Sequence, residues 1–204
     1  MSFAKIYTRG LLGLHAPLIE VEVHVSQGLP SLTIVGLAEA AVRESKDRVR
    51  SAIINSGFQF PTKRLTINLA PADLPKDGSR LDLPIALGIL MASGQIPEHA
   101  TDQLEFIGEL ALDGQLRPIT GILSIAIACQ QSGHQLILPE QNAPEASQLP
   151  QFEVFAAQHL KDVCEHLSKQ QPIAQYQLQT TTTVDQYKFD LADVKGQQRP
   201  RRAL

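Results

Sequence analysis

The chain has 204 residues, of which 43% are hydrophobic and 19% charged, and its formal net charge is −3. This composition permits a packed core and excludes a globally disordered chain, and the length favours one domain with additional segments. The slightly acidic balance argues against a protein that binds nucleic acid over its whole surface, but it leaves room for a local basic stripe.

The first third of the sequence has the alternation that is typical of strands. Residues 19–25 alternate apolar and polar side chains, which puts four aliphatic residues on one face: Ile19, Val21, Val23 and Val25. A weaker strand is expected over residues 4–12. After the turn signal Gly28-Leu29-Pro30, residues 32–35 predict a hairpin partner for the strand 19–25.

The period then changes to that of helices. Apolar residues at helical spacing predict a helix over 38–55, with Gly57 as its C-cap. Residues 64–69 predict another strand and 71–80 a loop. The segment 81–91 is apolar on most sides, which predicts a buried helix with Pro84 in its first turn.

The second half alternates strands and helices. We expect a strand over 106–112, the tight turn Asp113-Gly114 and a return strand from Leu116. The remaining pattern predicts helices over 119–131 and 159–168 and short strands over 135–138 and 152–155. Early strands followed by this alternation indicate an α+β fold, an α/β sandwich with a mixed sheet packed by helices.

Several sequence signals for secretion, membrane insertion, disulfides and metal binding are missing from the sequence. No signal-peptide pattern opens the chain, and its longest apolar stretch is too short to span a bilayer, so we expect a cytoplasmic protein without membrane contact. Cys129 and Cys164 are too few for a disulfide scaffold and are expected as buried free thiols in helices. The six histidines are scattered, and we expect no metal site.

The amino-acid composition changes after residue 168. Residues 169–188 are rich in Gln and Thr and predict a linker, and residues 189–204 begin a different segment. We therefore expect a domain over residues 1–168, the linker, and then the start of a further module.

The loop at residues 75–82 is the most informative segment for chemistry. No Gly-Lys pair occurs, so the chain lacks a Walker A loop and is not expected to bind ATP itself. In one interpretation the loop is a turn and helix cap, with Asp77 or Ser79 accepting helix N–H bonds. In the other, Ser79 is a nucleophile at a helix N-terminus.

Two family resemblances bear on this choice. Pro75-Lys76-Asp77-Gly78, followed by Gly108-Glu109 and Gly114 to Gly121, resembles the Lon-type protease domain, which implies a Lon-protease-like, ribosomal-protein-like β-α-β fold. Matched residue by residue, the family's catalytic serine falls on Arg80 and its catalytic lysine on Leu123. The resemblance therefore implies that the shape is kept and both catalytic groups are lost.

Longer strings resemble the N-terminal domain of the ComM/YifB family of magnesium-chelatase-like AAA+ ATPases. They are residues 36–45, residues 68–73, and residues 78–84 with Ala86. Residues 190–197 resemble the segment that opens the family's AAA+ module, so Val194, Lys195, Gly196 and Gln197 are expected to border the parent's nucleotide site. The resemblance implies a hexamer that uses ATP and Mg²⁺ to drive DNA branch migration in natural transformation and recombination, with a non-catalytic domain here.

The role of this domain has three candidate interpretations. Contact with DNA would use a basic stripe, for which the candidates are Arg43, Lys46, Arg50, Lys63, Arg64 and Arg80. The alternative for the helical residues is a solvated face balanced by Glu44 and Asp47, and for Arg80 a buried pair with Asp82 or Asp73. The second interpretation is a scaffold or partner-docking domain without DNA contact, and the third is a residual serine peptidase.

Overall fold

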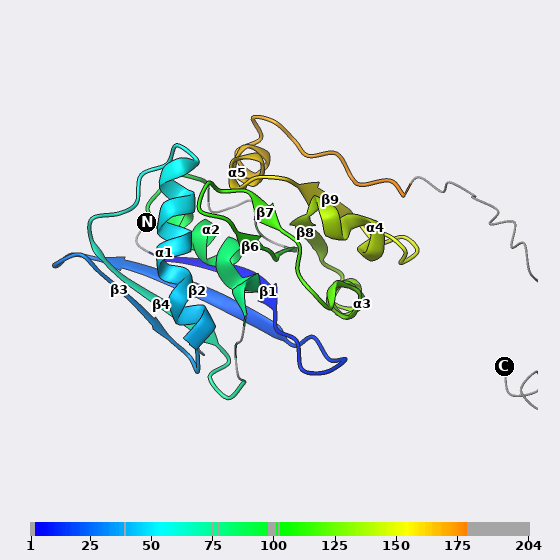
Figure 1. Cartoon of the computed structure of the whole chain (residues 1–204), viewed down its shortest axis with the longest axis horizontal. Coiled ribbons are helices and arrows are strands. Elements are labelled where there is room, and N and C mark those ends of the chain that lie inside the picture. Colours follow the sequence, from blue (N-terminus) through cyan, green and yellow to red (C-terminus); the bar gives the residue numbers. More distant parts are fainter. Residues whose placement is uncertain are drawn as a thin grey trace, which may run out of the picture.

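The computed structural model describes residues 3–38, 40–74, 76, 78–97, 101 and 103–178, and it describes Ala40, Ala41 and Arg43 by their backbone alone. Figure 1 shows the elements in chain order. They are β1 (Phe3–Arg9), β2 (Leu18–Ser26), β3 (Ser31–Val35), α1 (Ala40–Asn55), β4 (Arg64–Ala70), the 3₁₀ turn η1 (Ser79–Leu81), α2 (Asp82–Ala92), β5 (Leu104–Phe106), β6 (Glu109–Leu110), β7 (Leu116–Arg117), α3 (Ile122–Gln131), β8 (Gln135–Pro139), the 3₁₀ turn η3 (Glu140–Asn142), α4 (Ala143–Ala146), β9 (Val154–Ala157) and α5 (Leu160–Leu167).

Seven strands form one sheet in the order β3-β4-β2-β1-β5-β8-β9, and β6 and β7 form a separate antiparallel pair. The pairs β1–β2 and β2–β4 are antiparallel, and the other neighbours in the sheet are parallel. The sheet is therefore mixed, and the predicted α+β class with a mixed sheet is confirmed.

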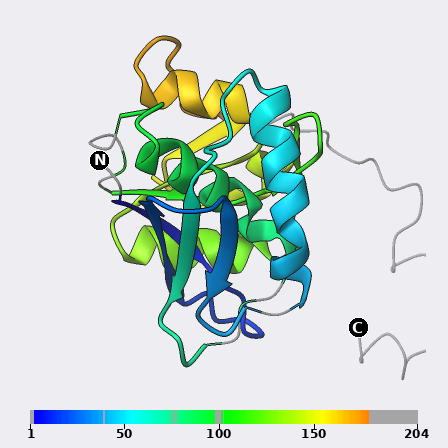
Figure 2. The same cartoon turned by 90° about the vertical axis from the view of Figure 1, so that its left-hand side faces the viewer.

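Helices cover the two faces of the sheet unequally. Along β8, Ile137 belongs to the core that α1, α2 and α5 share with the strands, whereas Leu136 and Leu138 belong to a second core with α3 and α4. Because neighbouring residues of a strand point to opposite faces, these two cores lie on opposite sides of the sheet. Figures 1 and 2 show α1 and α2 over the β1–β4 part of the sheet.

The predicted faces of β2 are correct. Ile19, Val21, Val23 and Val25 are buried, and Glu20, Glu22 and His24 lie on the other face with partly or fully exposed side chains. The predicted hairpin of β2 with β3 is wrong, because β4 lies between them and pairs antiparallel with β2 and parallel with β3. The alternation of residues 64–69 permits this pairing as well as the local one, so the sequence pattern does not decide between them.

The single strand predicted over residues 106–112 is also wrong, because the backbone leaves the sheet at Gly108. The Gly108 N–H donates to the Arg80 carbonyl at 3.0 Å, and the Gly108 carbonyl accepts from Leu83 N–H at 3.1 Å. Gly108 has φ 158, close to the extended region. The chain is thereby diverted from β5 to the start of α2, and β6 begins beside the loop that the sequence singled out.

Helix α3 begins three residues later than predicted. The side chain of Asn142 holds the Ile119 backbone from both sides, with Oδ1 accepting from N–H and Nδ2 donating to the carbonyl, each at 2.9 Å. Gly121 then adopts φ 76 as the N-cap of α3, where an added Cβ would lie 2.5 Å from Leu11 Cδ2. Residues 118–120 therefore form a fixed extended segment. The short helix α4 was not predicted.

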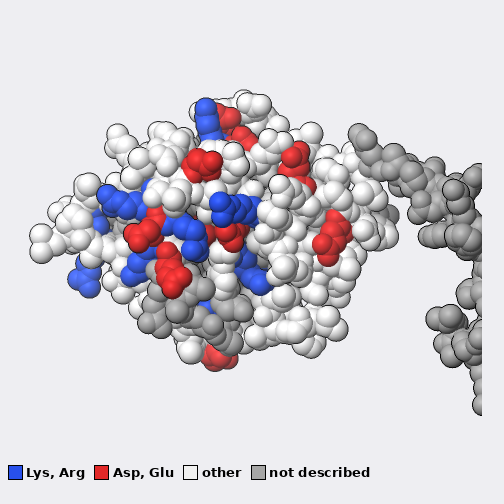
Figure 3. All heavy atoms as spheres, in the orientation of Figure 1, with Lys and Arg blue, Asp and Glu red and all other residues white. Residues whose placement is uncertain are grey.

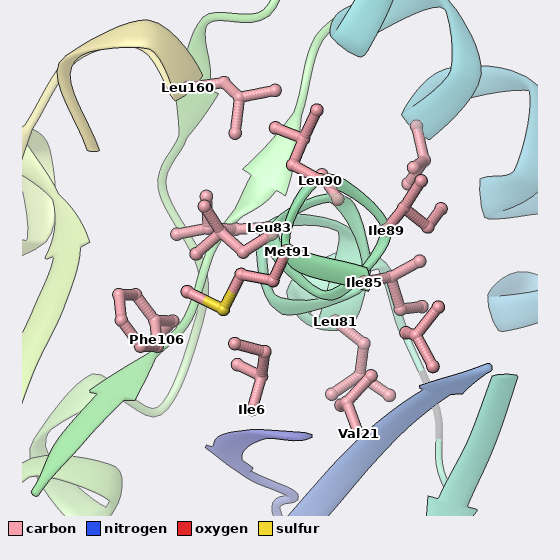
Figure 4. Close-up of a cluster of buried hydrophobic side chains, with 14 of the residues drawn as sticks. Ile6, Val21, Leu81, Leu83, Ile85, Ile89, Leu90, Met91, Phe106 and Leu160 are labelled. Atoms are coloured by element: carbon pink, nitrogen blue, oxygen red, sulfur yellow. The ribbon is translucent and has the colours of Figure 1, made fainter. Parts of the chain in front are cut away.

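Helix α2 is the centre of the main core. All eleven of its residues are buried, as the sequence predicted, and Figure 4 shows its side chains pointing outward on every side. Burying a Leu or Ile in such a position stabilises a fold by roughly 1.5–3 kcal/mol. Gly88 allows close approach to the sheet, because a Cβ there would lie 2.6 Å from Val23 Cγ2.

A buried ion pair connects β1 with β5. Arg9 is 5% exposed and Glu105 is fully buried, and the guanidinium donates two hydrogen bonds of 2.7 Å to the carboxylate. Arg9 also donates to the Ala16 carbonyl and to Ser132 Oγ, and His134 Nδ1 lies 2.9 Å from Glu105. This network links the antiparallel half of the sheet to the parallel half.

The two ends of the sheet differ. Beyond α5, Gln175 forms a bridge with Phe155 of β9 and Tyr176 N–H donates to the Val154 carbonyl at 2.8 Å. At the other end β3 pairs with β4 alone. The domain boundary at residue 168 and the linker 169–188 remain predictions, and residues 179–204, with the expected nucleotide-site border at Val194 to Gln197, lie outside the described residues.

Candidate functional site

A cleft of about 230 Å³ lies where η1, β6 and the extended segment before α3 meet. Its position follows from the two backbone features above: the diversion at Gly108 brings β6 to η1, and Asn142 fixes the opposite wall. The residues that line it are Gly78, Ser79, Arg80, Glu109, Pro118, Ile119 and Thr120. It therefore brings together the loop and the Gly108-Glu109 and Pro118-Ile119-Thr120 segments that carry the Lon resemblance.

The hydroxyl in this cleft is bonded to an acid. Ser79 Oγ donates to the carboxylate of Glu109, and Arg117 Nη1 lies 3.4 Å from the other oxygen of the same carboxylate. The expected helix cap by Ser79 is wrong, since neither η1 nor α2 has a side-chain cap. Asp77, the other cap candidate, lies outside the described residues.

The nearest lysine in sequence has another partner. Lys76 is 1% exposed, burial lowers its pKa, and its amine donates to the Pro71 carbonyl. Leu123, at the position of the Lon lysine, is an aliphatic residue on α3 and is 38% exposed. Within the described residues, no hydrogen bond joins Ser79 to an amine that would act as its base.

Arg80 has no counter-charge of the kind predicted. Its Nε and Nη1 atoms are buried and have no hydrogen-bond partner among the described residues. The expected pair with Asp82 or Asp73 is not formed there, because Asp82 instead accepts from Arg48 Nε at 2.9 Å and from Nη2 at 3.3 Å. The start of α2 also has few free donors, since Asp82 N–H bonds to Ser79 O, Leu83 N–H to Gly108 O, and Pro84 has none.

Sequence reasoning missed Arg48, Lys76 and Glu109 as participants. Arg48 follows Ser45 by three residues on α1, which places it next to the buried stripe and is a signal for a partner in the core. Burial raises the pKa of Asp82 to about 6 against the opposing effect of Arg48, and Asp82 in turn raises the pKa of Arg48. Burial of Asp82 therefore raises its pKa by more than its hydrogen bonds lower it.

A second candidate surface lies along α1 and the adjoining ends of β3 and β4. Lys46 donates to the Leu32 carbonyl at 2.9 Å, and the Arg50 guanidinium lies 4.8 Å from the centre of the Phe60 ring. Arg64 begins β4, opposite Ser31 of β3. We call Lys46, Arg50, Lys63 and Arg64 the basic group.

Acidic residues accompany the basic group. Glu44 and Asp47 are exposed on the same helix, and Figure 3 shows basic side chains over α1 and the neighbouring end of the sheet with acidic ones among them. Lys63 and Arg64 are exposed, and the described residues contain no ion-pair partner for either. The side chain of Arg43 lies outside the described part of the structure, and Arg80 lies in the separate cleft.

A cavity adjoins this surface. It has a volume of about 520 Å³ and is lined by residues that include Phe60, Lys63, Gln59 and Gln95. Over the described ranges, no cluster of three or more His, Cys, Asp or Glu residues could hold a metal ion. No helix in that part of the chain is long and apolar enough to cross a membrane.

Comparison with known proteins identifies the family. Residues 21–142, which include the whole cleft, match the family described as subunit ChlI of Mg-chelatase. The chain belongs to this ChlI family. The match spans the sheet from β2 to β8 together with α1, α2 and α3.

The full-length likeness is to ComM and YifB. The chain is 47% identical over 208 residues to competence protein ComM of Haemophilus influenzae, covering 100% of this chain and 41% of ComM. It is 47% identical over 208 residues to YifB of Salmonella typhimurium, covering 100% of this chain and 40% of YifB. The chain thus spans about two-fifths of the length of these curated relatives.

A weaker likeness extends to Lon proteases. The chain is 31% identical over 142 residues to Lon protease of Chloroflexus aurantiacus, covering 65% of this chain and 17% of that protein. The resemblances expected from the loop and from the longer strings are both confirmed as sequence similarities.

Proposed function

We propose that this chain is the non-catalytic N-terminal domain of a hexameric, cytoplasmic AAA+ ATPase that drives DNA branch migration in natural transformation and recombination. The family match and the full-length likeness to a competence protein support this proposal. In the parent, ATP and Mg²⁺ would be bound by the motor module, for which residues 190–197 are the expected beginning.

The domain itself contributes contact with DNA through the basic group. The observation that carries this proposal is that Lys63 and Arg64 are exposed without ion-pair partners in the described residues, beside Arg50 and Lys46. Phosphate contacts need such unpaired cations and carry no sequence information. Glu44 and Asp47 reduce the local positive charge, so we expect moderate affinity that depends on the parent's other contacts.

The chemistry of the cleft supports the proposed absence of peptidase activity. A serine hydroxyl needs a base to become a nucleophile, and Ser79 bonds instead to a carboxylate that is shared with Arg117. A carboxylate can accept the serine proton, but the position of the Lon lysine is occupied by Leu123. We expect no peptide turnover by the chain, and activity abolished by Ser79→Ala would contradict this.

Binding of the 204-residue chain to branched and single-stranded DNA across a salt series tests the DNA contact. We expect the affinity to fall steeply with salt and to be lost in an Arg50→Glu/Lys63→Glu variant. The matched control is Lys161→Glu/Lys169→Glu, which changes the net charge equally on and just beyond α5. Binding that is independent of salt, or an equal loss in both variants, would refute the basic group as the contact.

The second candidate role is assembly or partner docking. It is favoured by β3, which within the described part of the chain pairs only with β4, and by exposed apolar side chains at the end of β3 and beside it: Leu29, Val35 and Leu37. An exposed strand edge is a ready site for pairing with another chain. Comparing the oligomeric state of the full-length parent with and without the residues before Lys169 tests this role, and an unchanged hexamer would count against it.

A further inference from the structure

We propose that the cleft beside η1 binds a phosphate-type oxyanion and that Arg80 is its principal ligand. The cleft is distinct from the basic group, so this proposal does not depend on DNA binding by that surface. Its basis is the state of the Arg80 side chain and of the groups around it.

The charged side chain of Arg80 has hydrogen-bond donors without an acceptor among the described residues. Both Nε and Nη1 are buried without a partner. A buried donor that has lost water and gained no acceptor is unfavourable, and a charged one more so. Arg9, a buried arginine, shows the usual arrangement for guanidinium donors withdrawn from water, with a bidentate carboxylate and two further acceptors. A bound oxyanion would supply the hydrogen-bond acceptors that the Arg80 guanidinium lacks.

The acids near Arg80 are already engaged. Asp82 accepts two hydrogen bonds from Arg48 and one from Leu110 N–H at 3.3 Å. Glu109 accepts from Ser79 on one oxygen and faces Arg117 on the other. Because Arg117 offsets the charge of Glu109, Arg80 is the uncompensated charge among the described residues that line the cleft.

The lining of the cleft favours a compact, highly charged ligand. Its volume of about 230 Å³ is small, and Thr120, another lining residue, adds an exposed side chain with a hydroxyl group. The Arg80 guanidinium in the cleft, whose planar donors match an oxyanion in fork geometry, suits a doubly charged oxyanion. A phosphate monoester or inorganic phosphate carries such a charge near neutral pH.

Nitrogen-15 NMR titration of the 204-residue chain with sodium phosphate, at constant ionic strength, tests the proposal. We expect saturable shifts of amides around Gly78, Glu109 and Thr120, with sodium acetate at least tenfold weaker. Arg80→Met should lose at least tenfold in apparent affinity for phosphate, whereas Lys169→Met should not change it. No saturation by phosphate, or equal binding by Arg80→Met, would overturn the proposal.

A thermal measurement separates a binding role from a structural one. Without phosphate, Arg80→Met should melt at the same temperature as the parent chain or higher, because two buried donors without a partner among the described residues have been removed. Phosphate should then raise the melting temperature of the parent chain more than that of the variant. The general stabilising effect of phosphate acts on both proteins, so it drops out when the two shifts are subtracted. A lower melting temperature of the variant without phosphate would show an internal partner and overturn the proposal.

Arg80→Lys provides a second variant that keeps the charge but not the planar donors. We expect phosphate affinity below that of the parent chain, and affinity equal to that of the parent chain would argue against ligation by the planar guanidinium donors. Thymidine oligonucleotides with and without a 5′-phosphate distinguish the source of the phosphate. Tighter binding of the phosphorylated oligonucleotide, lost in Arg80→Met, would assign the cleft to a DNA end; equal binding of both would assign it to free phosphate or a nucleotide.

Discussion

The Asp82 carboxylate is completely buried and accepts hydrogen bonds from the Arg48 guanidinium at 2.9 and 3.3 Å. This pair joins α1 to the first residue of α2, beneath the loop that resembles a protease site. Removing a carboxylate from water disfavours its charged form, and here that effect exceeds the benefit of the pair. The balance leads to a measurable dependence of stability on pH.

We predict that the contribution of Asp82 to the free energy of unfolding decreases as pH rises. Burial raises the pKa of Asp82 from 3.8 to about 6, so the folded chain holds this proton over a range in which the unfolded chain releases it. The stabilisation is complete below pH 3.8 and is lost as pH rises through about 6, an effect of roughly 3 kcal/mol. Urea unfolding at pH 4 to 7 should show this fall in the parent chain relative to Asp82→Asn.

A companion variant checks the part played by Arg48. Arg48→Met leaves the buried carboxylate without its partner, so its destabilisation should be largest at pH 7, about 3 kcal/mol, and smaller at pH 4, where Asp82 is protonated. If the stability of the parent chain relative to Asp82→Asn rose with pH instead, the interaction with Arg48 would affect the pKa of Asp82 more than burial does.

The close approach of Gly88 to Val23 predicts a coupled pair of substitutions. Gly88→Ala should destabilise the chain by about 1–2 kcal/mol, because an added Cβ would lie 2.6 Å from Val23 Cγ2 and overpacking exceeds the gain in helix propensity. In a Val23→Ala background the same change should be neutral or stabilising. Urea denaturation of the four proteins in this cycle measures the coupling, and additive effects would contradict the proposed contact.

The two thiols should be unreactive in the folded chain. Cys129 and Cys164 are buried, and burial raises the pKa of both, that of Cys164 to about 12. Because the thiolate is the reactive form, we expect labelling by Ellman's reagent at pH 8 to be at least a hundredfold slower than in urea. Cys129→Ser and Cys164→Ser assign the two reactions, and rapid labelling of either thiol without denaturant would be the contrary result.

The basic group should contribute to the salt dependence of DNA binding one charge at a time. Lys63→Gln should reduce the slope of log K against log salt by about one, because each neutralised phosphate releases about one counterion. Lys169→Gln is the matched control and should leave the slope unchanged. A slope unaffected by Lys63→Gln would place the phosphate contacts elsewhere.

Local patterns predicted the elements of this fold more successfully than its pairings. The alternation in residues 19–25 and the apolar stretch 81–91 determine which side chains are buried, and both predictions are confirmed. The partner of β3, the end of β5 and the start of α3 depend on distant groups: β4, Arg80 and Asn142. No short segment contains that information.

The candidate site was predicted in location but not in its connections. The loop at residues 75–82 was identified from its turn residues, and the loss of both Lon catalytic groups could be read from Arg80 and Leu123. The partners of Ser79 and Asp82 could not, because Glu109 and Arg48 come from separate elements that only the folded chain brings together. The same limit applies to the buried nitrogens of Arg80, since burial without a partner is a property of three-dimensional packing.

The Arg9–Glu105 pair crosses the junction between two differently built parts of the sheet. If β1 and β5 were to separate, Arg9 and Glu105 would lose the two hydrogen bonds that join them, and breaking a buried ion pair is strongly unfavourable. Partial separation of β1 from β5 is therefore unfavourable, and the seven strands should stay together as one sheet. Any movement of this domain is therefore expected to carry the strands on both sides of the β1–β5 junction together.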